Sequence, residues 1–310
     1  MPEPQLISRF APSPSGRLHA GNIFSYLVCW LLVRRNNGEI ILRIEDLDES
    51  RSKAQYCDQL KRDLEKLGLY WDREVSPQST RSDAYEYAFS QLKEMDRVYP
   101  CFCTRADIQA ASAPHKGEYA PYPRTCFGLS GEALQTKKAK AIEEGRAAAW
   151  RIHVEAQSYT FKDYFQGQQS FDLETCIGDS IIKRSNGSFA YQLAVCVDDA
   201  AEQVNTVVRG CDLLPSSALQ LYIQNLLGYP HPSYAHVPLL ITQEGRRIAK
   251  RDNDASLDVL MQSYANPEGV LGHIAAISGL IESERAMTAE DLLREAKLDA
   301  CKNTLCIEWR

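Results

Sequence analysis

The stretch from Arg9 to Asn22, RFAPSPSGRLHAGN, constrains the fold of this chain more than any other part of its sequence. The apolar run 6–11 is broken by two prolines and a glycine, and residues 23–33 that follow are apolar with helical spacing. This order predicts a strand, a tight turn and a helix. The N-terminus of such a helix offers backbone N–H groups and the positive end of its dipole, which suit a phosphate chain. With His19 beside these donors, the stretch is either a phosphate-binding turn or an ordinary loop with an incidental histidine.

A basic loop far downstream favours the phosphate-binding interpretation. Residues 244–251 read EGRRIAKR and combine a glycine hinge with basic side chains at Arg246, Arg247, Lys250 and Arg251. The loop follows the strand-like run 237–241, which would deliver it to the site. A cation from this loop could reach the same phosphates as His19, so the two segments together predict a site for a triphosphate.

Composition narrows the class of protein. The 310 residues are 44% hydrophobic and 25% charged, as in an ordinary soluble protein of about two domains. The longest apolar run, 26–33, is too short to span a membrane, and the polar start of the chain predicts no signal peptide. A net charge of −6 does not favour general nucleic-acid binding, although a local basic patch could still bind phosphates. Ten cysteines spread through a chain of this size predict a reducing cytoplasm and a local metal site rather than a disulfide scaffold.

Three of these cysteines have the spacing of a metal site. Cys101 and Cys103 are separated by one residue, and Cys126 follows a loop rich in proline and tyrosine. Clustered thiolates in the cytoplasm select zinc. By chemistry alone the fourth ligand stays open between His115, Tyr122 and water, and three unligated core cysteines are the alternative.

The two phosphate-binding signals, in this order, resemble the HIGH and KMSKS signatures of class I aminoacyl-tRNA synthetases. Further segments are similar to the catalytic core of glutamyl-tRNA synthetase from about residue 6 to 255: RFAPSP at 9–14, LRIEDLD at 42–48, AYQLAV at 190–195 with Asp198 and Asp199, and RGCDLL at 209–214. The resemblance implies an α/β fold, with a Rossmann-like doubly wound parallel sheet, an inserted zinc-bearing α+β subdomain and a short C-terminal helical region.

We therefore predict four regions: 1–99, the first half of the nucleotide-binding domain; 100–188, the inserted tRNA-contacting subdomain; 189–256, the second half with the KMSKS-like loop; and 257–310, a short helical region without an anticodon-binding domain. Strands are expected at 6–11, 40–44, 191–197, 204–208 and 237–241, and helices at 23–33, 53–67, 81–95 and 216–227. Asp46 and Asp48 are expected to cap the helix 53–67.

Apolar spacing and turn residues also predict elements in the insert and in the C-terminal region. In the insert we predict a helix at 133–146, strands at 150–155 and 159–165, and a hairpin at 181–191 that turns at Asn186-Gly187. Near the C-terminus the chain has a short segment at 257–261, and we predict a helix at 267–280 and another at 288–298, the latter opened by a capping box between Thr288 and Asp291.

The resemblance also assigns roles to single residues. The positions that match the amino-acid-binding residues of the family, and so would bind L-glutamate, are Arg9, Phe10, Ala11, Pro12, Ser13, Glu45, Tyr191 and Arg209. Arg9 and Arg209 would each hold one carboxylate of the substrate with a bidentate fork. Glu45 would hold its ammonium group. The QSTR sequence at 78–81 matches a family element to which we assign only a positioning role.

ATP, with Mg²⁺ held mainly by its own phosphates, would be bound by His19, Gly21, Asn22 and Lys250. Of these, His19, Asn22 and Lys250 are the expected catalytic residues. The KMSKS-like loop consists of Arg247, Ile248, Ala249, Lys250 and Arg251, in which Arg247 and Ala249 replace the lysine and serine of the family pattern. Short relatives carry a Cys-x-Cys and Tyr-xxx-Cys arrangement, which ranks Tyr122 before His115 as the fourth ligand of one structural zinc ion, with Cys101, Cys103 and Cys126.

Function follows from the length of the C-terminal region. Residues 257–310 are too few to build the large helical domain that reads an anticodon in glutamyl-tRNA synthetases, so the chain resembles a shortened branch of the family. That branch activates glutamate with ATP and attaches it to the queuosine base in the anticodon of tRNA(Asp). A truncated enzyme that charges tRNA(Glu) and a catalytically inactive RNA-binding module are the alternatives. We expect a cytoplasmic monomer that binds L-glutamate, ATP and tRNA(Asp) carrying queuosine, and no membrane.

Overall fold

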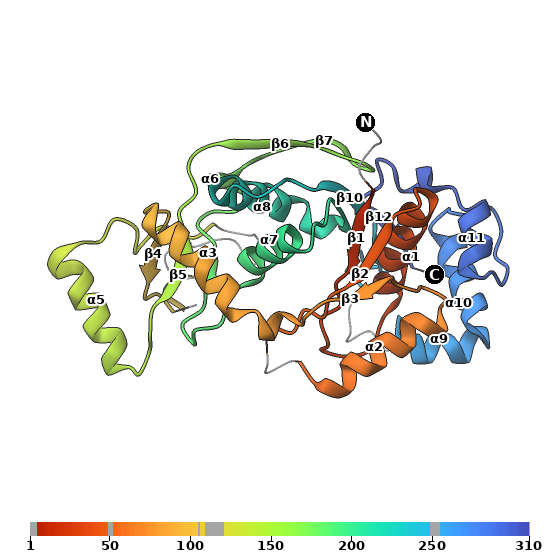
Figure 1. Cartoon of the computed structure of the whole chain (residues 1–310), viewed down its shortest axis with the longest axis horizontal. Helices are drawn as coiled ribbons and strands as arrows, with labels where there is room; N and C mark the ends of the chain where they lie inside the picture. The colour runs from red at the N-terminus through yellow and green to blue at the C-terminus, as the bar shows by residue number, and fades with distance from the viewer. Residues whose placement is uncertain (1–4, 49–51, 105, 109–120, 249–254, 310) are drawn as a thin grey trace.

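The N-terminal region of the computed structural model, which describes residues 5–48, 52–104, 106–108, 121–248 and 255–309, is a parallel β-α-β unit (Figure 1). Strands β1 (Ile7–Phe10), β2 (Glu39–Leu42) and β3 (Arg73–Glu74) pair in that order, all parallel. Helix α1 (Ala20–Arg35) connects the first two, and α2 (Ala54–Lys66) precedes the third. Because α1 contacts this sheet, β9 and the C-terminal helices α10 and α11, its apolar residues are buried on nearly all sides.

A second sheet continues beside β1. Its order is β7 (Gly167–Asp172), β6 (Ser158–Asp163), β10 (Ser233–Val237) and β9 (Thr206–Gly210), parallel except for the β6–β7 hairpin. The two sheets meet where the backbone N–H of Asn205 donates to the carbonyl of Ile7 at 3.0 Å. Further along the two strands, Arg9 of β1 donates to the carbonyl of Val208 in β9 at 3.4 Å. The carboxyl ends of β1 and β9 therefore also lie side by side, where ligands of open parallel α/β sheets bind. The parallel α/β sheet predicted from the sequence is confirmed.

Two predicted strands are wrong. Residues 191–197 belong to a helix, α7 (Tyr191–Ala201), which packs between α3 (Ser82–Glu94) and α8 (Leu214–Leu227). Since every residue from Leu193 to Asp199 is buried, its apolar run lacks the alternation that marks an exposed helix face. The run 237–241 is divided at Pro238 between β10 and β11 (Leu239–Ile241), because proline lacks the N–H that a continuous strand needs.

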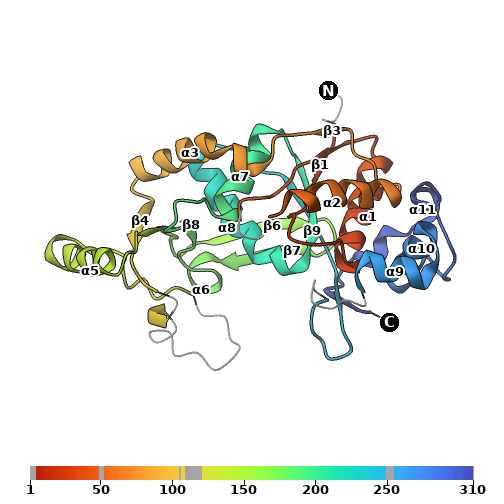
Figure 2. The same ribbon diagram turned by 90° about the horizontal axis from the view of Figure 1, so that it is seen from below.

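The segment after α3 forms an antiparallel sheet of β4 (Val98–Cys101), β5 (Ala149–Ile152) and β8 (Ile181–Lys183). Helix α5 (Gly131–Glu143) lies at the end of the molecule far from the C-terminal helices (Figures 1 and 2). The expected hairpin at 181–191 is reduced to β8 and a single bridge between Lys183 and Phe189. The short helix α6 (Leu173–Cys176) follows β7, and β6 pairs with β10, so part of the range expected as an insert extends the core sheet.

The C-terminal region is helical, as predicted. It contains α9 (Leu257–Tyr264), α10 (Pro267–Ile277) and α11 (Ala289–Glu295), followed by the 3₁₀ turn Leu298–Cys301. Thr288 and Asp291 form the predicted capping box of α11. Strand β12 (Cys306–Glu308), which the sequence analysis missed, pairs with β11. Among the described residues, no helix combines the length and apolar character needed to cross a bilayer.

Candidate functional site

The turn between β1 and α1 lines a pocket of about 280 Å³, here called the His19 pocket. Its walls include backbone and side chains from Ala11 to His19, together with Asn22 and Arg247. Asn22 accepts a hydrogen bond from the backbone N–H of His19 at 3.4 Å, so its amide oxygen caps α1. A side chain at Gly21 would crowd the His19 ring, since a Cβ there would lie 3.2 Å from it. The start of α1 thus opens onto a hollow, as a phosphate site requires.

The basic loop reaches the same pocket. Arg247 lines it and pairs with Asp212, while the neighbouring Ile248 is buried in the core. On the far side of the loop, the backbone N–H of Leu257 donates to the carbonyl of Leu18 at 2.9 Å. Ala249, Lys250 and Arg251 lie outside the described residues, as does His115. The two ends of the loop nevertheless meet the first motif, although about 230 positions of sequence separate them.

A second pocket of about 200 Å³, here called the Glu45 pocket, adjoins the first, because Ser13 and Ser15 line both. Three of the residues expected to bind an amino acid line it: Ser13, Glu45 and Tyr191. Burial raises the pKa of Glu45, whose carboxylate accepts from Arg43 at 3.1 Å.

The other expected amino-acid-binding residues are placed differently. Phe10 is fully buried and packs against the ring of Tyr26, so its side chain belongs to the core. Ala11 and Pro12 line the His19 pocket rather than the Glu45 pocket. Arg9 and Arg209 are both buried, at 4% and 6% exposure.

Arg209 is held by neutral side chains. It donates to the hydroxyl of Tyr191 at 3.2 Å, to that of Ser217 at 2.8 Å and to Nε2 of His236 at 3.2 Å. Among the described residues, no carboxylate lies within ion-pair distance of it. A buried charge is costly without a partner. Arg209 therefore has the properties of a receptor for a ligand carboxylate.

Arg9, in contrast, is paired within the protein. Its Nε lies 3.4 Å from Asp199, and its guanidinium also donates to the carbonyl of Val208. Burial alone would raise the pKa of Asp199, but Arg43 and Arg9 together hold it below its ordinary value. Asp199 therefore stays charged and orients Arg9 next to the end of β9.

Arg43 is the centre of a buried ion network that the sequence analysis missed. Its side chain is fully buried, with Asp199 at 2.7 Å, Glu202 at 2.6 Å and Glu45 at 3.1 Å. Burial would lower the pKa of Arg43, yet these carboxylates hold it well above its ordinary value. The available signal was one arginine inside the otherwise apolar run 40–44, which on a buried strand demands carboxylate partners.

A second buried carboxylate holds the QSTR element. Asp198 accepts from Gln78 at 2.7 Å and from Arg81 at 2.6 Å, while Ser79 donates to Asp46 from both its backbone N–H and its hydroxyl. The expectation that Asp46 caps the next helix is therefore wrong, because α2 begins at Ala54 and its N-cap residue, Lys53, makes no side-chain cap hydrogen bond. Its carboxylate is used instead to attach the 3₁₀ turn Gln78–Thr80.

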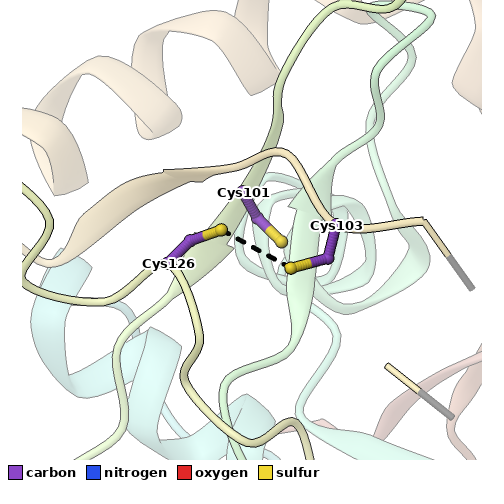
Figure 3. Close-up of side chains that lie close together, drawn as sticks. All are labelled: Cys101, Cys103 and Cys126. Carbon is purple, nitrogen blue, oxygen red and sulfur yellow. Dashed lines mark hydrogen bonds between the residues drawn. The ribbon is translucent and has the colours of Figure 1, made fainter. Parts of the chain in front are cut away.

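The three cysteines of the expected metal site are clustered. The sulfur atoms of Cys101, Cys103 and Cys126 lie within 4.8 Å of one another and point toward a common centre (Figure 3). The hydroxyl of Tyr122 is 3.3 Å from Cys101 and 3.4 Å from Cys103, and the Cys103 and Cys126 sulfurs are 3.5 Å apart. Thiolates at about 2.3 Å from a tetrahedral ion lie about 3.8 Å apart, so the three cysteines could hold a metal ion, with the Tyr122 hydroxyl beside them.

Comparison with known proteins defines the class. Residues 5–299 match the family model of class I tRNA synthetases (E and Q), catalytic domain, so the chain belongs to that class. Two solved structures share the fold. A glutamate tRNA ligase from Elizabethkingia meningosepticum has a TM-score of 0.80 and 23% identity, over 99% of this chain and 67% of that one. A glutamate-tRNA synthetase from Elizabethkingia anophelis has a TM-score of 0.81 and 23% identity, over 99% and 68%.

Closer relatives narrow the class to one branch. The chain is 39% identical over 283 residues to a glutamyl-Q tRNA(Asp) synthetase of Nitratidesulfovibrio vulgaris, covering 88% of this chain and 86% of that protein. It is 43% identical over 273 residues to the protein of the same name from Nocardia farcinica, covering 88% and 84%. The chain is a member of the glutamyl-Q tRNA(Asp) synthetase family.

Proposed function

We propose that this protein activates L-glutamate with ATP and transfers the glutamyl group to the queuosine base of tRNA(Asp). The observation that carries the proposal is Arg209, a buried guanidinium beside the Glu45 pocket with no carboxylate partner among the described residues. A dicarboxylic amino acid would supply that partner, and Glu45 would hold its ammonium group.

The reaction would occur where the two pockets adjoin. An oxygen of the glutamate α-carboxylate attacks the α-phosphorus of ATP, the bond to the β-phosphate breaks, and pyrophosphate leaves. In a second step a hydroxyl oxygen of queuosine attacks the carbonyl carbon of the adenylate. AMP then leaves and the hydroxyl proton passes to water. Neither step needs a covalent intermediate on the protein, so catalysis consists of positioning and charge stabilisation.

Several residues of the His19 pocket would stabilise the phosphates. His19, the NH₂ group of Asn22 and the N-terminus of α1 line one side. Arg247 enters from the other side, and Lys250, three residues further along the same loop, would supply the cation that follows the charge developing on the phosphates. Mg²⁺ carried by ATP would neutralise part of that charge when bound.

The metal site would have a structural role. We infer that Cys101, Cys103, Cys126 and Tyr122 hold one zinc ion, which would fasten the end of β4 to the segment that precedes α5. Because the cluster lies in the part of the chain that resembles the RNA-contacting insert, loss of the ion would affect use of tRNA more than activation of glutamate.

Two assays test the proposed function. Glutamate-dependent exchange of pyrophosphate into ATP measures activation, and its absence would indicate the inactive RNA-binding module. Labelled glutamate supplied with purified tRNA(Asp), with and without queuosine, and with tRNA(Glu) identifies the acceptor. We expect label only on queuosine-containing tRNA(Asp), at the modified base. Label on the 3′ end of tRNA(Glu) would instead identify a truncated glutamyl-tRNA synthetase.

A further inference from the structure

A large hollow lies next to the Glu45 pocket. It has a volume of about 770 Å³, and its walls are residues 46–48, the 3₁₀ turn Gln78–Thr80, the start of α3 and the segment 184–189. Leu47, Asp48, Gln78 and Arg184 line both hollows, so the two adjoin. We propose that this hollow, here called the acceptor pocket, receives the queuosine base after it leaves the anticodon stack, with carboxylates holding its ammonium group. The inference rests on the proposed function and names the recognition of its acceptor.

The charge of the acceptor pocket is opposite to what contact with RNA alone would favour. Asp46, Asp48, Asp83 and Glu86 line it, against one cation, Arg184. RNA is a polyanion whose binding is driven by basic side chains, so an acidic wall repels it. The repulsion becomes an attraction only for a part of the RNA that carries positive charge. Queuosine carries such a charge, in a secondary amine that is protonated at neutral pH. Guanosine and a 3′-terminal adenosine do not.

The placement of the pocket matches the connectivity of queuosine. Its amine and the nearer hydroxyl of its diol are on adjacent carbons of one ring, so a carboxylate that binds the amine must lie close to the carbonyl that the hydroxyl attacks. Asp48 meets this condition, because it lines both the Glu45 pocket and the acceptor pocket. Enzymes that modify a base take it out of its stack into a pocket, and the volume here is within the range of about 300–1,000 Å³ typical of ligand sites.

Gln78 supplies a second indication of a ligand. It is 1% exposed and lines both hollows, and its Nε2 donates to Asp198 at 2.7 Å. Its Oε1 is buried without a hydrogen-bond partner among the described atoms. A buried acceptor of this kind is costly unless a donor arrives, and a hydroxyl of the queuosine diol is such a donor.

Asp83 is the residue on which to test the proposal. It lies in the first turn of α3, whereas Glu86 pairs with Lys183 at 2.6 Å and Asp46 holds Ser79. We expect Asp83→Asn to raise the KM for queuosine-containing tRNA(Asp) about tenfold, as for loss of a charged hydrogen bond, and Asp83→Lys to raise it further. General electrostatics predicts the opposite sign, because removing an acid strengthens binding of a polyanion.

The matched controls are Glu94→Gln and Glu94→Lys, which change the same charge on the same helix at an exposed position outside the pocket. We expect them to leave the KM for tRNA unchanged or slightly lower. The proposal of an acceptor pocket would be overturned if the variants at Asp83 and those at Glu94 had the same KM for tRNA while they retained pyrophosphate exchange and the thermal unfolding midpoint. The proposed function would then remain intact. Absence of exchange in the unaltered protein would overturn the proposed function itself.

Discussion

Arg209 donates a buried hydrogen bond of 3.2 Å from its Nε to Nε2 of His236. Since an arginine N–H can only donate, Nε2 of His236 must accept. The imidazole proton is therefore on Nδ1, where Asp163 accepts it at 2.6 Å. Asp163 lies on β6, so the strand that follows the metal-site region orients the arginine proposed to bind substrate.

Removing Arg209 should weaken glutamate binding. Arg209→Ala is expected to raise the KM for glutamate at least tenfold in pyrophosphate exchange and to change kcat less, because the contact exists before and during the reaction. Arg209→Lys should recover only part of the loss, since lysine cannot offer the bidentate fork. An unchanged KM in Arg209→Ala would show that this guanidinium does not bind the substrate.

His236 should act through Arg209. We expect His236→Leu to raise the KM for glutamate roughly tenfold, because Arg209 loses its orienting acceptor. His236→Gln places an amide oxygen near the position of Nε2 and should restore most of the affinity. His273→Leu, which removes another buried histidine, on α10, is the control. Equal effects of all three changes would indicate a general loss of packing instead of positioning.

The same histidine makes stability depend on pH. Burial lowers the pKa of His236 to about 4, against the opposing hydrogen bond to Asp163. Below its unfolded pKa of about 6.5, the unfolded chain binds a proton that the folded chain does not, so stability falls as pH falls from 6.5 toward 4. Between pH 6.5 and 4, denaturant unfolding should show that the unaltered protein loses about 3 kcal/mol more of its free energy of unfolding than His236→Gln does. Parallel curves for the two proteins would contradict this assignment.

Arg43 should contribute strongly to folding. Arg43→Met leaves Asp199, Glu202 and Glu45 buried without their shared cation, which is expected to lower the free energy of unfolding by about 3–5 kcal/mol. Arg294→Met removes an exposed ion pair on α11 and should cost at most about 1 kcal/mol. Urea unfolding measures both, and similar costs for the two variants would show that the buried network is not stabilising.

Metal analysis tests the cysteine cluster. Protein purified under reducing, chelator-free conditions should carry about one zinc per chain, and Cys126→Ser should lose it. Tyr122→Phe tests whether the hydroxyl of Tyr122 is the fourth metal ligand. The change keeps the ring beneath Arg151, and so its packing, and removes only the hydroxyl. Cys176→Ser, at an exposed cysteine, should keep the metal. Less than half an equivalent of zinc in the unaltered protein would contradict the site.

Much of the fold was predictable because its signals are local. The helices from 53 to 95 and those beyond residue 256 follow apolar spacing and capping that a short window contains. The errors occur where the environment of a segment decides its conformation. Helix α7 is buried on all sides, so its sequence shows no polar face. Strand β12 has three residues and exists because β11 offers it an edge.

The sequence by itself determined the strand, turn and helix that begin at Arg9 and the spacing of the cysteines, since each depends on residue types within short stretches. The substrate-binding candidates came from the resemblance of short motifs to a known family. Only the tertiary structure decided which charges are paired. The sequence alone does not distinguish Arg9 from Arg209, yet Asp199 neutralises Arg9, whereas no carboxylate in the described part of the chain pairs with Arg209. Partners such as Asp163 and His236 lie 73 residues apart, and the energy of a buried charge depends on neighbours that the chain acquires only on folding.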